Sequence, residues 1–344
     1  VYSDVDFAQA GDGFIVAGIW NYNNAEIDLY YVDAAGTSRT FRYTEFVAAS
    51  GQTIDSLRVV RGNGRRVTLV WRETGAGIRM GQAEACLVSG AWEIRQPGCA
   101  TSAELTSTLI SPSTTALPGV AADSTHVDWA ASQTCQSTAT QRRLAIAYLS
   151  SATSLNFFRV NENGSSKETE TVADTEASPR VFAEPDLTYF KDSLNADQFL
   201  IGYVTKDSGA TTPRADLNYW LSSDPTWSYF TWFDFATQNG VDSIARPRVS
   251  ATATGMWISA LRYVADASTF KRQVMTRSMD RSGLRTPTSS SVEFPITSGA
   301  CSTDPACRPG DKSGCTHFAP FGRVFYAGSG STPAGTYAST LSCF

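Results

Sequence analysis

FIVAGIW (Phe14–Trp20) is the first of six short apolar runs that end in an aromatic residue, and these runs decide the fold. The other five are VTLVW (Val67–Trp71), LAIAY (Leu144–Tyr148), FLIGY (Phe199–Tyr203), WISALRY (Trp257–Tyr263) and RVFY (Arg323–Tyr326). Nearly continuous hydrophobicity over so few residues indicates a β-strand that is covered on both faces. The closing aromatic residues lie 51 to 77 positions apart, so the chain is predicted to repeat one β-module six times.

Each apolar run has a similar local context. A shorter strand precedes it, an alternating strand follows it, and a more polar fourth stretch comes next, as in VDFAQA, IDLYYVD and RTFRYTEF around the first run. Turn sequences such as DAAGTS and NENGSS separate these stretches. We therefore predict an all-β fold, a β-propeller of six blades with three to four antiparallel strands each. A pair of β-sandwiches is the structural alternative.

The spacing of the runs divides the chain into approximate blades within one domain, 1–344. These blades are 1–50, 51–100, 118–175, 178–240, 244–297 and 300–344. The longest interval contains a stretch rich in Ser, Thr and Pro, 100–118, which is predicted to be a loop insertion. A degenerate seventh blade in this interval is the alternative.

The composition excludes some classes of partner. The net charge of −5 argues against binding to nucleic acid, because the phosphate backbone requires a basic surface. No apolar run is long enough for a transmembrane helix. Abundant Ser, Thr, Ala and Gly and a low charged fraction of 18% are typical of extracellular β-proteins, so a secreted or cell-surface location is predicted.

The seven cysteines favour disulfides over zinc, because the sequence has no CxxC pair. The predicted pairs are Cys86–Cys99, Cys301–Cys307 and Cys315–Cys343, which leaves Cys135 unpaired. A separate motif, Asn163-Gly164-Ser165, matches an N-glycosylation acceptor and matters only in a host that glycosylates.

Four aspartates occupy comparable places at the start of a first strand: Asp6, Asp55, Asp128 and Asp186. First strands line the central channel of a propeller, so these carboxylates could converge on one mouth of it. Converging carboxylates suit glycoside hydrolysis or a hard cation such as Ca²⁺. The structural alternative is that each aspartate accepts hydrogen bonds from neighbouring backbone amides.

Aromatic residues gather in YWLSSDPTWSYFTWFDF (Tyr219–Phe235). One face of this stretch has to meet a neighbouring blade, and the other would be a platform for a sugar ring or a protein partner. The predicted ligand-binding residues are Trp220, Trp227 and Tyr229, with Arg246 and Arg248 in the first strand of the fifth predicted blade. Trp20, Trp71 and Trp257 belong to the central runs and are predicted to fill the core between blades.

With these repeats the chain resembles six-bladed propellers in general, a group that includes sialidases and some fucose-binding lectins. Sialidases usually carry Ser-x-Asp-x-Gly-x-Thr-Trp boxes and an Arg-Ile-Pro motif. This sequence has neither, which argues against sialidase activity. The resemblance implies the fold and transfers no binding residue.

The leading functional hypothesis is a non-catalytic, extracellular binding or assembly module that recognises a glycan or a protein partner. The absence of a complete catalytic motif carries this hypothesis, and no cofactor is predicted apart from the Ca²⁺ alternative. One alternative is a glycoside hydrolase that uses the aspartates at the channel mouth. Another is a structural subunit that self-assembles into an extracellular filament or coat.

Overall fold

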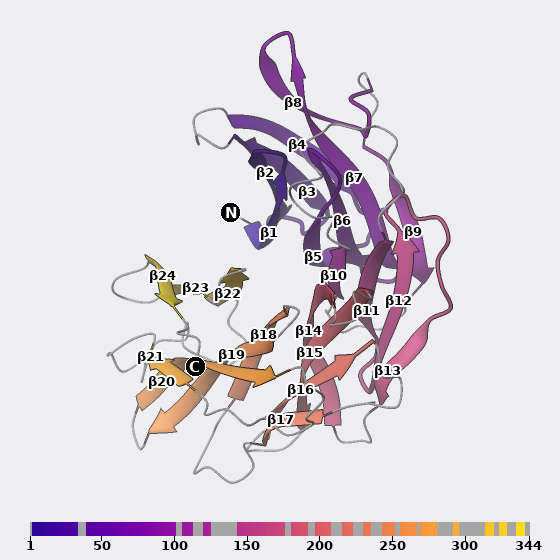
Figure 1. Ribbon diagram of the computed structural model, residues 1–344. Helices are drawn as coiled ribbons and strands as arrows, with labels where there is room; N and C mark the ends of the chain where they lie inside the picture. The colour runs from indigo at the N-terminus through magenta and orange to yellow at the C-terminus, as the bar shows by residue number, and fades with distance from the viewer. Residues whose placement is uncertain are drawn as a thin grey trace. The chain divides into compact units, whose positions relative to one another are not determined.

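The apolar runs and their flanking strands form antiparallel β-sheets (Figure 1). The computed structural model describes residues 2–33, 39–100, 105–112, 120–124, 143–175, 180–191, 197–207, 215–222, 230–234, 243–251, 255–266, 269–280, 292–295, 314–319, 323–328 and 335–340. Within these residues, 24 strands form six sheets.

The first three sheets follow one another along the chain. The first comprises β1 (Tyr2–Ala10), β2 (Gly13–Trp20), β3 (Glu26–Val32) and β4 (Arg39–Val47). The second comprises β5 (Ile54–Arg61), β6 (Arg66–Glu73), β7 (Gly77–Val88), β8 (Ala91–Arg95) and β9 (Ser107–Pro112). The third comprises β10 (Val120–Ser124), β11 (Arg143–Ser151), β12 (Ser154–Asn161) and β13 (Thr171–Thr175).

The later sheets repeat the same strand order. The fourth comprises β14 (Arg180–Lys191), β15 (Asp197–Asp207), β16 (Ala215–Leu221) and β17 (Phe230–Asp234). The fifth comprises β18 (Ser243–Ala251), β19 (Gly255–Asp266), β20 (Thr269–Asp280) and β21 (Val292–Pro295). The sixth comprises β22 (Gly314–Ala319), β23 (Arg323–Gly328) and β24 (Gly335–Thr340).

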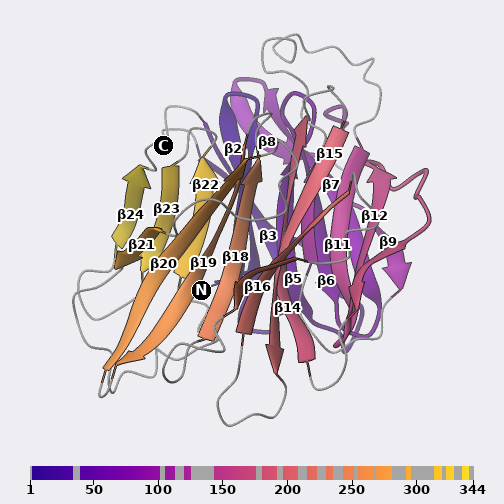
Figure 2. The same cartoon turned by 60° about the horizontal axis from the view of Figure 1, so that its bottom comes forward.

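The chain divides into two compact units, each described here by itself. One unit contains Val1–Ser151 and Asn156–Thr171, and the other contains Ala152–Leu155 and Val172–Phe344. Figure 2 shows the long paired strands β19 and β20 of the second unit as neighbouring orange arrows. The part of the chain that the structure describes contains no helix long and apolar enough to cross a membrane.

Each of the six apolar runs forms the second strand of its sheet, as the repeat predicts. These second strands are β2, β6, β11, β15, β19 and β23. Every one of them pairs with the strand before it and the strand after it. The repeat in the sequence therefore identified the second strand of every sheet.

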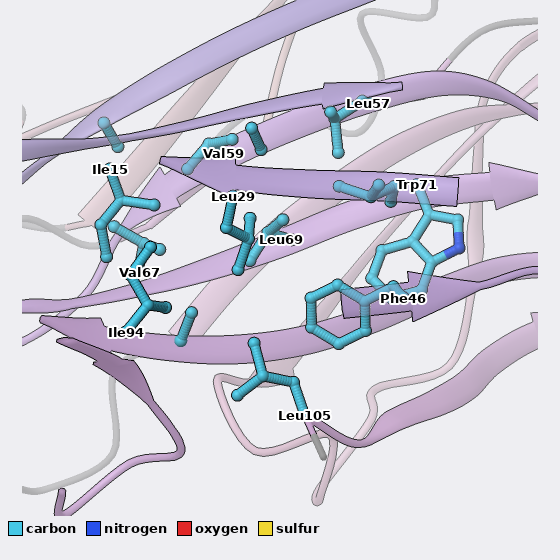
Figure 3. Close-up of a cluster of buried hydrophobic side chains, with 14 of the residues drawn as sticks. Ile15, Leu29, Phe46, Leu57, Val59, Val67, Leu69, Trp71, Ile94 and Leu105 are labelled. Atoms are coloured by element: carbon cyan, nitrogen blue, oxygen red, sulfur yellow. The ribbon is translucent and has the colours of Figure 1, made fainter. Parts of the chain in front are cut away.

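Two buried clusters explain why these strands are apolar along their whole length. On β6, the side chains of Val67, Leu69 and Trp71 point into a cluster between the first and second sheets (Figure 3). Val70, on the opposite face, points into a cluster between the second and third sheets. The second sheet is buried on both faces, so alternation along β6 changes which core a residue enters instead of exposing it to water.

The predicted loop insertion 100–118 contains a strand, which corrects that part of the prediction. Residues 107–112 form β9, which pairs with the first half of β7, from Gly77 to Gly81. β8 pairs only with the second half of β7, from Glu84 to Val88. The long β7 therefore leaves half of its edge open, and β9 satisfies the backbone groups there.

The prediction for the first strand of the third sheet is also corrected. The placement of Asp128 at the start of a first strand predicts a strand within 126–132, whereas Val120–Ser124 pairs with β11. The side chains of Val120 and Ala121 are fully buried, and Val120 belongs to the cluster between the second and third sheets. The apolar side chains of Val120 and Ala121 fill this covered position. The segment 126–132 lies outside the described residues.

The disulfide Cys86–Cys99 is confirmed. It joins β7 to the turn that follows β8, with 5.8 Å between the two Cα atoms. Cys301, Cys307 and Cys343 lie outside the described residues, and Cys315 lies in β22, so the other two predicted pairs stay predictions.

Replacing Trp71 tests the buried cluster between the first two sheets. Its side chain is 2% exposed and packs on Phe46, with 4.9 Å between the ring centroids. We expect Trp71→Ala to lower the free energy of unfolding by about 3–5 kcal/mol, because the substitution opens a cavity. Leu87→Ala is the control, since Leu87 is 58% exposed and its truncation should change little. Equal denaturant midpoints for the two variants would contradict this account.

Candidate functional site

Three chain segments meet at one end of the first two sheets. They are the β2–β3 turn, the β4–β5 loop and the β6–β7 turn. The backbone N–H of Ile54 donates to the carbonyl oxygen of Asn24 at 2.5 Å, and that of Thr74 donates to the carbonyl of Thr53 at 2.8 Å. Asn24 has a φ of 51°, a left-handed conformation that asparagine tolerates well. This end is thus a surface of tight turns held together by main-chain bonds.

Two exposed aromatic side chains form a platform at this end. Trp20, the last residue of β2, is 38% exposed, and Tyr22, in the turn after it, is 85% exposed. Their ring centroids lie 5.6 Å apart with an interplanar angle of 31°. We call this pair the Trp20–Tyr22 platform. Two neighbouring rings exposed in this way are suited to binding rather than to packing.

Polar side chains neighbour the two platform residues in sequence and in strand register. The Asn23 side-chain amide donates to Glu26 Oε1 at 2.8 Å, and its Oδ1 accepts the backbone N–H of Ala25 at 3.0 Å. The hydroxyl of Tyr2, which lies opposite Trp20 in the β1–β2 register, donates to Asp28 Oδ2 at 2.9 Å. These bonds fix amide, hydroxyl and carboxylate groups of residues near Trp20 and Tyr22 in sequence or strand register.

Charged pairs support the same end of the second sheet. Arg72, 2% exposed, donates from Nε to Asp55 Oδ1 at 2.7 Å. Glu73, 1% exposed, forms an ion pair with Arg79 and accepts the backbone N–H of Ala49 at 2.8 Å. Burying these charges is tolerable because each one is paired and hydrogen-bonded.

Two of the aspartates proposed as catalytic bridge neighbouring sheets. Asp6 Oδ2, on β1, accepts the backbone N–H of Val59 on β5 at 2.8 Å. Asp186 Oδ2, on β14, accepts the backbone N–H of Val249 on β18 at 2.9 Å. The same interaction therefore occurs in both units, between the first strands of consecutive sheets, and Asp4 Oδ2 accepts the backbone N–H of Leu57 in the same way at 3.1 Å. We call it the aspartate clamp.

An arginine accompanies each clamp. Arg248 Nη1 donates to the carbonyl of Pro247 at 3.1 Å and lies 3.8 Å from Asp186 Oδ1. In the first unit, Arg58 Nη1 donates to the carbonyl of Leu57 at 2.7 Å and lies 3.9 Å from Asp4 Oδ2. The guanidinium groups thus neutralise carboxylates that face the neighbouring first strand.

Of the four candidate aspartates, the three that the structure describes each accept a hydrogen bond. Asp6 and Asp186 accept backbone amides, and Asp55 accepts Arg72, whereas Asp128 lies outside the described residues. Asp6 and Asp55 belong to one unit and Asp186 to the other. A catalytic role for these residues stays a prediction.

The predicted ligand-binding residues fall mostly on parts of the chain without described side chains. Trp227 and Tyr229 lie outside the described residues. Trp220 lies in β16 opposite Ile201, and Arg246 lies in β18. Arg248 is a clamp residue, as described above. Their binding roles stay predictions.

The Trp20–Tyr22 platform was missed because Trp20 was assigned to the core between blades. Trp71 is buried, as that assignment requires, whereas Trp20 is 38% exposed. On β2, Ile15, Ala17 and Ile19 face the second sheet and are fully buried, so Trp20 lies on the opposite face. The available signal was the turn NYNN (Asn21–Asn24), where a tyrosine among asparagines has no core to enter.

A second polar cluster lies in the same unit around Glu170. The hydroxyls of Ser111 and Tyr148 donate to its two carboxylate oxygens at 2.6 and 2.5 Å. Lys167 forms an ion pair with Glu170, and the Asn156 amide donates to it at 3.4 Å. The cluster joins β9, β11 and β12 to the segment that leads into β13, and it satisfies polar groups of two buried side chains, Ser111 and Tyr148.

The cluster shifts the pKa values of two of its groups, the Glu170 carboxyl and the Tyr148 hydroxyl. Burial raises the pKa of the Glu170 carboxyl, but hydrogen bonds from Lys167, Ser111 and Tyr148 and the Lys167 charge outweigh it and hold that pKa at about 2. Burial raises the pKa of the Tyr148 hydroxyl to about 12, and its hydrogen bond to Glu170 acts in the same direction. Glu170 is therefore an ionised acceptor and Tyr148 a neutral donor, which is a structural arrangement.

No group of three or more His, Cys, Asp or Glu side chains is arranged to hold a metal ion in the part of the chain that the structure describes. The Ca²⁺ alternative stays a prediction.

Repeated antiparallel sheets of this topology define the class: the protein has a β-propeller fold. No family model and no curated protein sequence matches the chain. Among solved structures, it is similar to a GH93 α-L-arabinofuranosidase of Fusarium graminearum in complex with arabinobiose, at 10% identity and a TM-score of 0.50. That match covers 98% of this chain and 92% of the enzyme.

Two further structures have the same kind of similarity. The F. graminearum enzyme with an iminosugar inhibitor matches at 11% identity and a TM-score of 0.50, over 99% of this chain and 94% of that one. The six-bladed lectin of Aleuria aurantia, which recognises fucose, matches at 11% identity and a TM-score of 0.46, over 97% and 89%.

Substitutions at Asp6 test the aspartate clamp. Asp6→Ala leaves the N–H of the buried Val59 without its acceptor, so we expect a loss of about 1–3 kcal/mol in the free energy of unfolding. Asp6→Asn keeps a side-chain oxygen in place and should lose less. Denaturant unfolding of the three proteins measures both effects. An Asp6→Ala variant as stable as the wild type would show that the clamp contributes nothing.

The Glu170 cluster gives a pH dependence with a definite sign. Because the pKa of Glu170 is about 2 in the folded protein and about 4.5 without these contacts, its contribution is complete above pH 4.5 and is lost as the pH falls toward 2. We expect Glu170→Gln to be less stable than the wild type at neutral pH and to lose less stability between about pH 5 and pH 3. Unfolding midpoints across this range provide the measurement, and parallel curves for the two proteins would contradict the expectation.

Proposed function

We propose that the protein is a non-catalytic, extracellular binding module that recognises a glycan through the Trp20–Tyr22 platform. The observation that carries this proposal is the exposed aromatic pair with fixed polar groups beside it. We also propose that the six sheets are the six blades of one propeller.

The chemistry of the platform suits a sugar ring. One face of a pyranose or furanose carries C–H groups that stack on an aromatic ring, while its hydroxyls need donors and acceptors at the edge. Trp20 and Tyr22 supply flat apolar area with few rotatable bonds, so little side-chain entropy is lost on binding. The Asn23 amide and the Glu26 carboxylate supply polar groups for hydroxyls beside the rings.

Binding is favoured over hydrolysis by the contacts of the described aspartates. A glycosidase needs one carboxyl that donates a proton and a second that attacks or activates water. Asp6 and Asp186 instead accept main-chain amides, and Asp55 accepts a buried arginine. The likeness to an enzyme that holds arabinobiose supports a glycan as the ligand of a protein with this fold.

The location is supported by the disulfide Cys86–Cys99, because such bonds form and persist in oxidising compartments. A glycan on a cell surface or in the surrounding matrix is the ligand that a protein in such a place meets.

A glycan array tests the proposal, followed by calorimetry with the best ligand. We expect the wild type to bind at least one glycan saturably and Tyr22→Ala to lower the affinity at least roughly tenfold, because the substitution removes one stacking ring. Tyr22→Phe keeps the ring and should retain most of the affinity. Incubation with the bound glycan should release no shorter sugar.

Phe14→Ala is the matched control, since Phe14 is an exposed aromatic residue (41%) at the other end of the same strand. Equal losses for Phe14→Ala and Tyr22→Ala, or no binding to any glycan, would overturn the proposal. Release of shorter sugars that stops with Asp6→Asn would favour the hydrolase alternative instead.

A further inference from the structure

Residues 161–165 form a turn that begins at Asn161, the last residue of β12, and exposes Asn163 and Ser165, and the proposed binding function does not use it. The backbone N–H of Gly164 donates to the carbonyl of Asn161 at 2.8 Å, and the N–H of Asn161 donates to the carbonyl of Ser165 at 2.9 Å. Gly164 has a φ of +82°, a conformation that glycine adopts without strain. The turn therefore has a fixed shape that main-chain bonds maintain.

Within this turn, the side chains of Asn163 and Ser165 are bonded to one another. Asn163 Oδ1 accepts the Ser165 hydroxyl at 2.7 Å and the Ser165 backbone N–H at 3.0 Å. Both bonds use the amide oxygen, and they draw electron density from the amide toward that atom. Asn163 itself is exposed. The serine hydroxyl of the acceptor motif Asn-x-Ser is thus hydrogen-bonded to the side-chain amide of the motif's asparagine.

The two sides of the turn have different surroundings. A Cβ at Gly164 would meet Met80 Sδ at 3.6 Å and Thr108 Cγ2 at 3.9 Å, so the glycine side rests on β7 and β9. The asparagine side is open to solvent. A bulky group on Asn163 would extend away from the sheets and would displace no buried residue.

We propose that Asn163 is a site of N-linked glycosylation. Asn163 Nδ2 forms a bond to the anomeric carbon of an oligosaccharide carried on a polyisoprenyl pyrophosphate. The bond between that carbon and the pyrophosphate oxygen breaks, the lipid pyrophosphate leaves with the electron pair, and a base of the transferase takes the amide proton. Cys86–Cys99 supports this assignment, because disulfide formation and N-glycosylation share the secretory route.

The test is secretion of the full chain from a eukaryotic host, followed by intact mass measurement before and after peptide-N-glycosidase. We expect the wild type to carry one glycan that the enzyme removes, leaving aspartate at position 163. Asn163→Gln and Ser165→Ala should lose the glycan, and Ser165→Thr should keep it. The sequence contains a single Asn-x-Ser/Thr motif, so the mass change reports on one position.

Asn161→Gln is the matched control: Asn161 lies outside the motif, although its side-chain amide donates to Ser165 Oγ at 3.0 Å, and the variant should keep the glycan. Secreted wild type without a glycan would overturn the proposal, as would a glycan that persists in Asn163→Gln. Equal unfolding midpoints of the deglycosylated wild type and Asn163→Gln would show that loss of the glycan is not loss of the fold. This outcome is independent of whether the Trp20–Tyr22 platform binds a ligand.

Discussion

The structure depends on the burial of both faces of its central strands. In an ordinary two-layer protein, alternate residues of a strand face water, whereas in β6 the residues on one face contact the first sheet and those on the other contact the third. A sheet that is covered on both faces cannot be stable alone, so the second sheet depends on the sheets on either side of it. The aspartate clamp meets a related requirement, since it gives a main-chain N–H in the neighbouring first strand an acceptor where sheets meet.

This constraint explains why the fold could be predicted from the sequence. Apolar runs such as LAIAY mark buried strands regardless of turn details, and all six proved to be second strands. Prediction failed where local sequence and tertiary context disagreed. The polar segment STLISP became β9 because β7 had an open edge to pair, and Val120–Ser124 pairs with β11 although its sequence is short and ends in polar residues.

The candidate site was less predictable, because exposure depends on which face of a sheet a residue occupies. Trp20 and Trp71 close equivalent runs, yet Trp71 is buried and Trp20 is 38% exposed beside Tyr22. The runs themselves do not distinguish the two residues, and the sequence signal lies only in the turn NYNN that follows Trp20. The aspartates show the converse case. Their repeated position suggested a shared chemical task, and in Asp6 and Asp186 the repetition reflects one main-chain contact that recurs between sheets.

The division of β7 between two partners has a consequence for how such a chain can change over time. β8 and β9 each take one half of the same edge, so the second sheet holds a fifth strand without displacing any of the other four. Growth at an outer edge leaves the buried central strands untouched. Repeats of this kind can therefore gain sequence at their rims while their cores stay constant, and two chains can share one architecture after nearly all recognisable sequence similarity has disappeared.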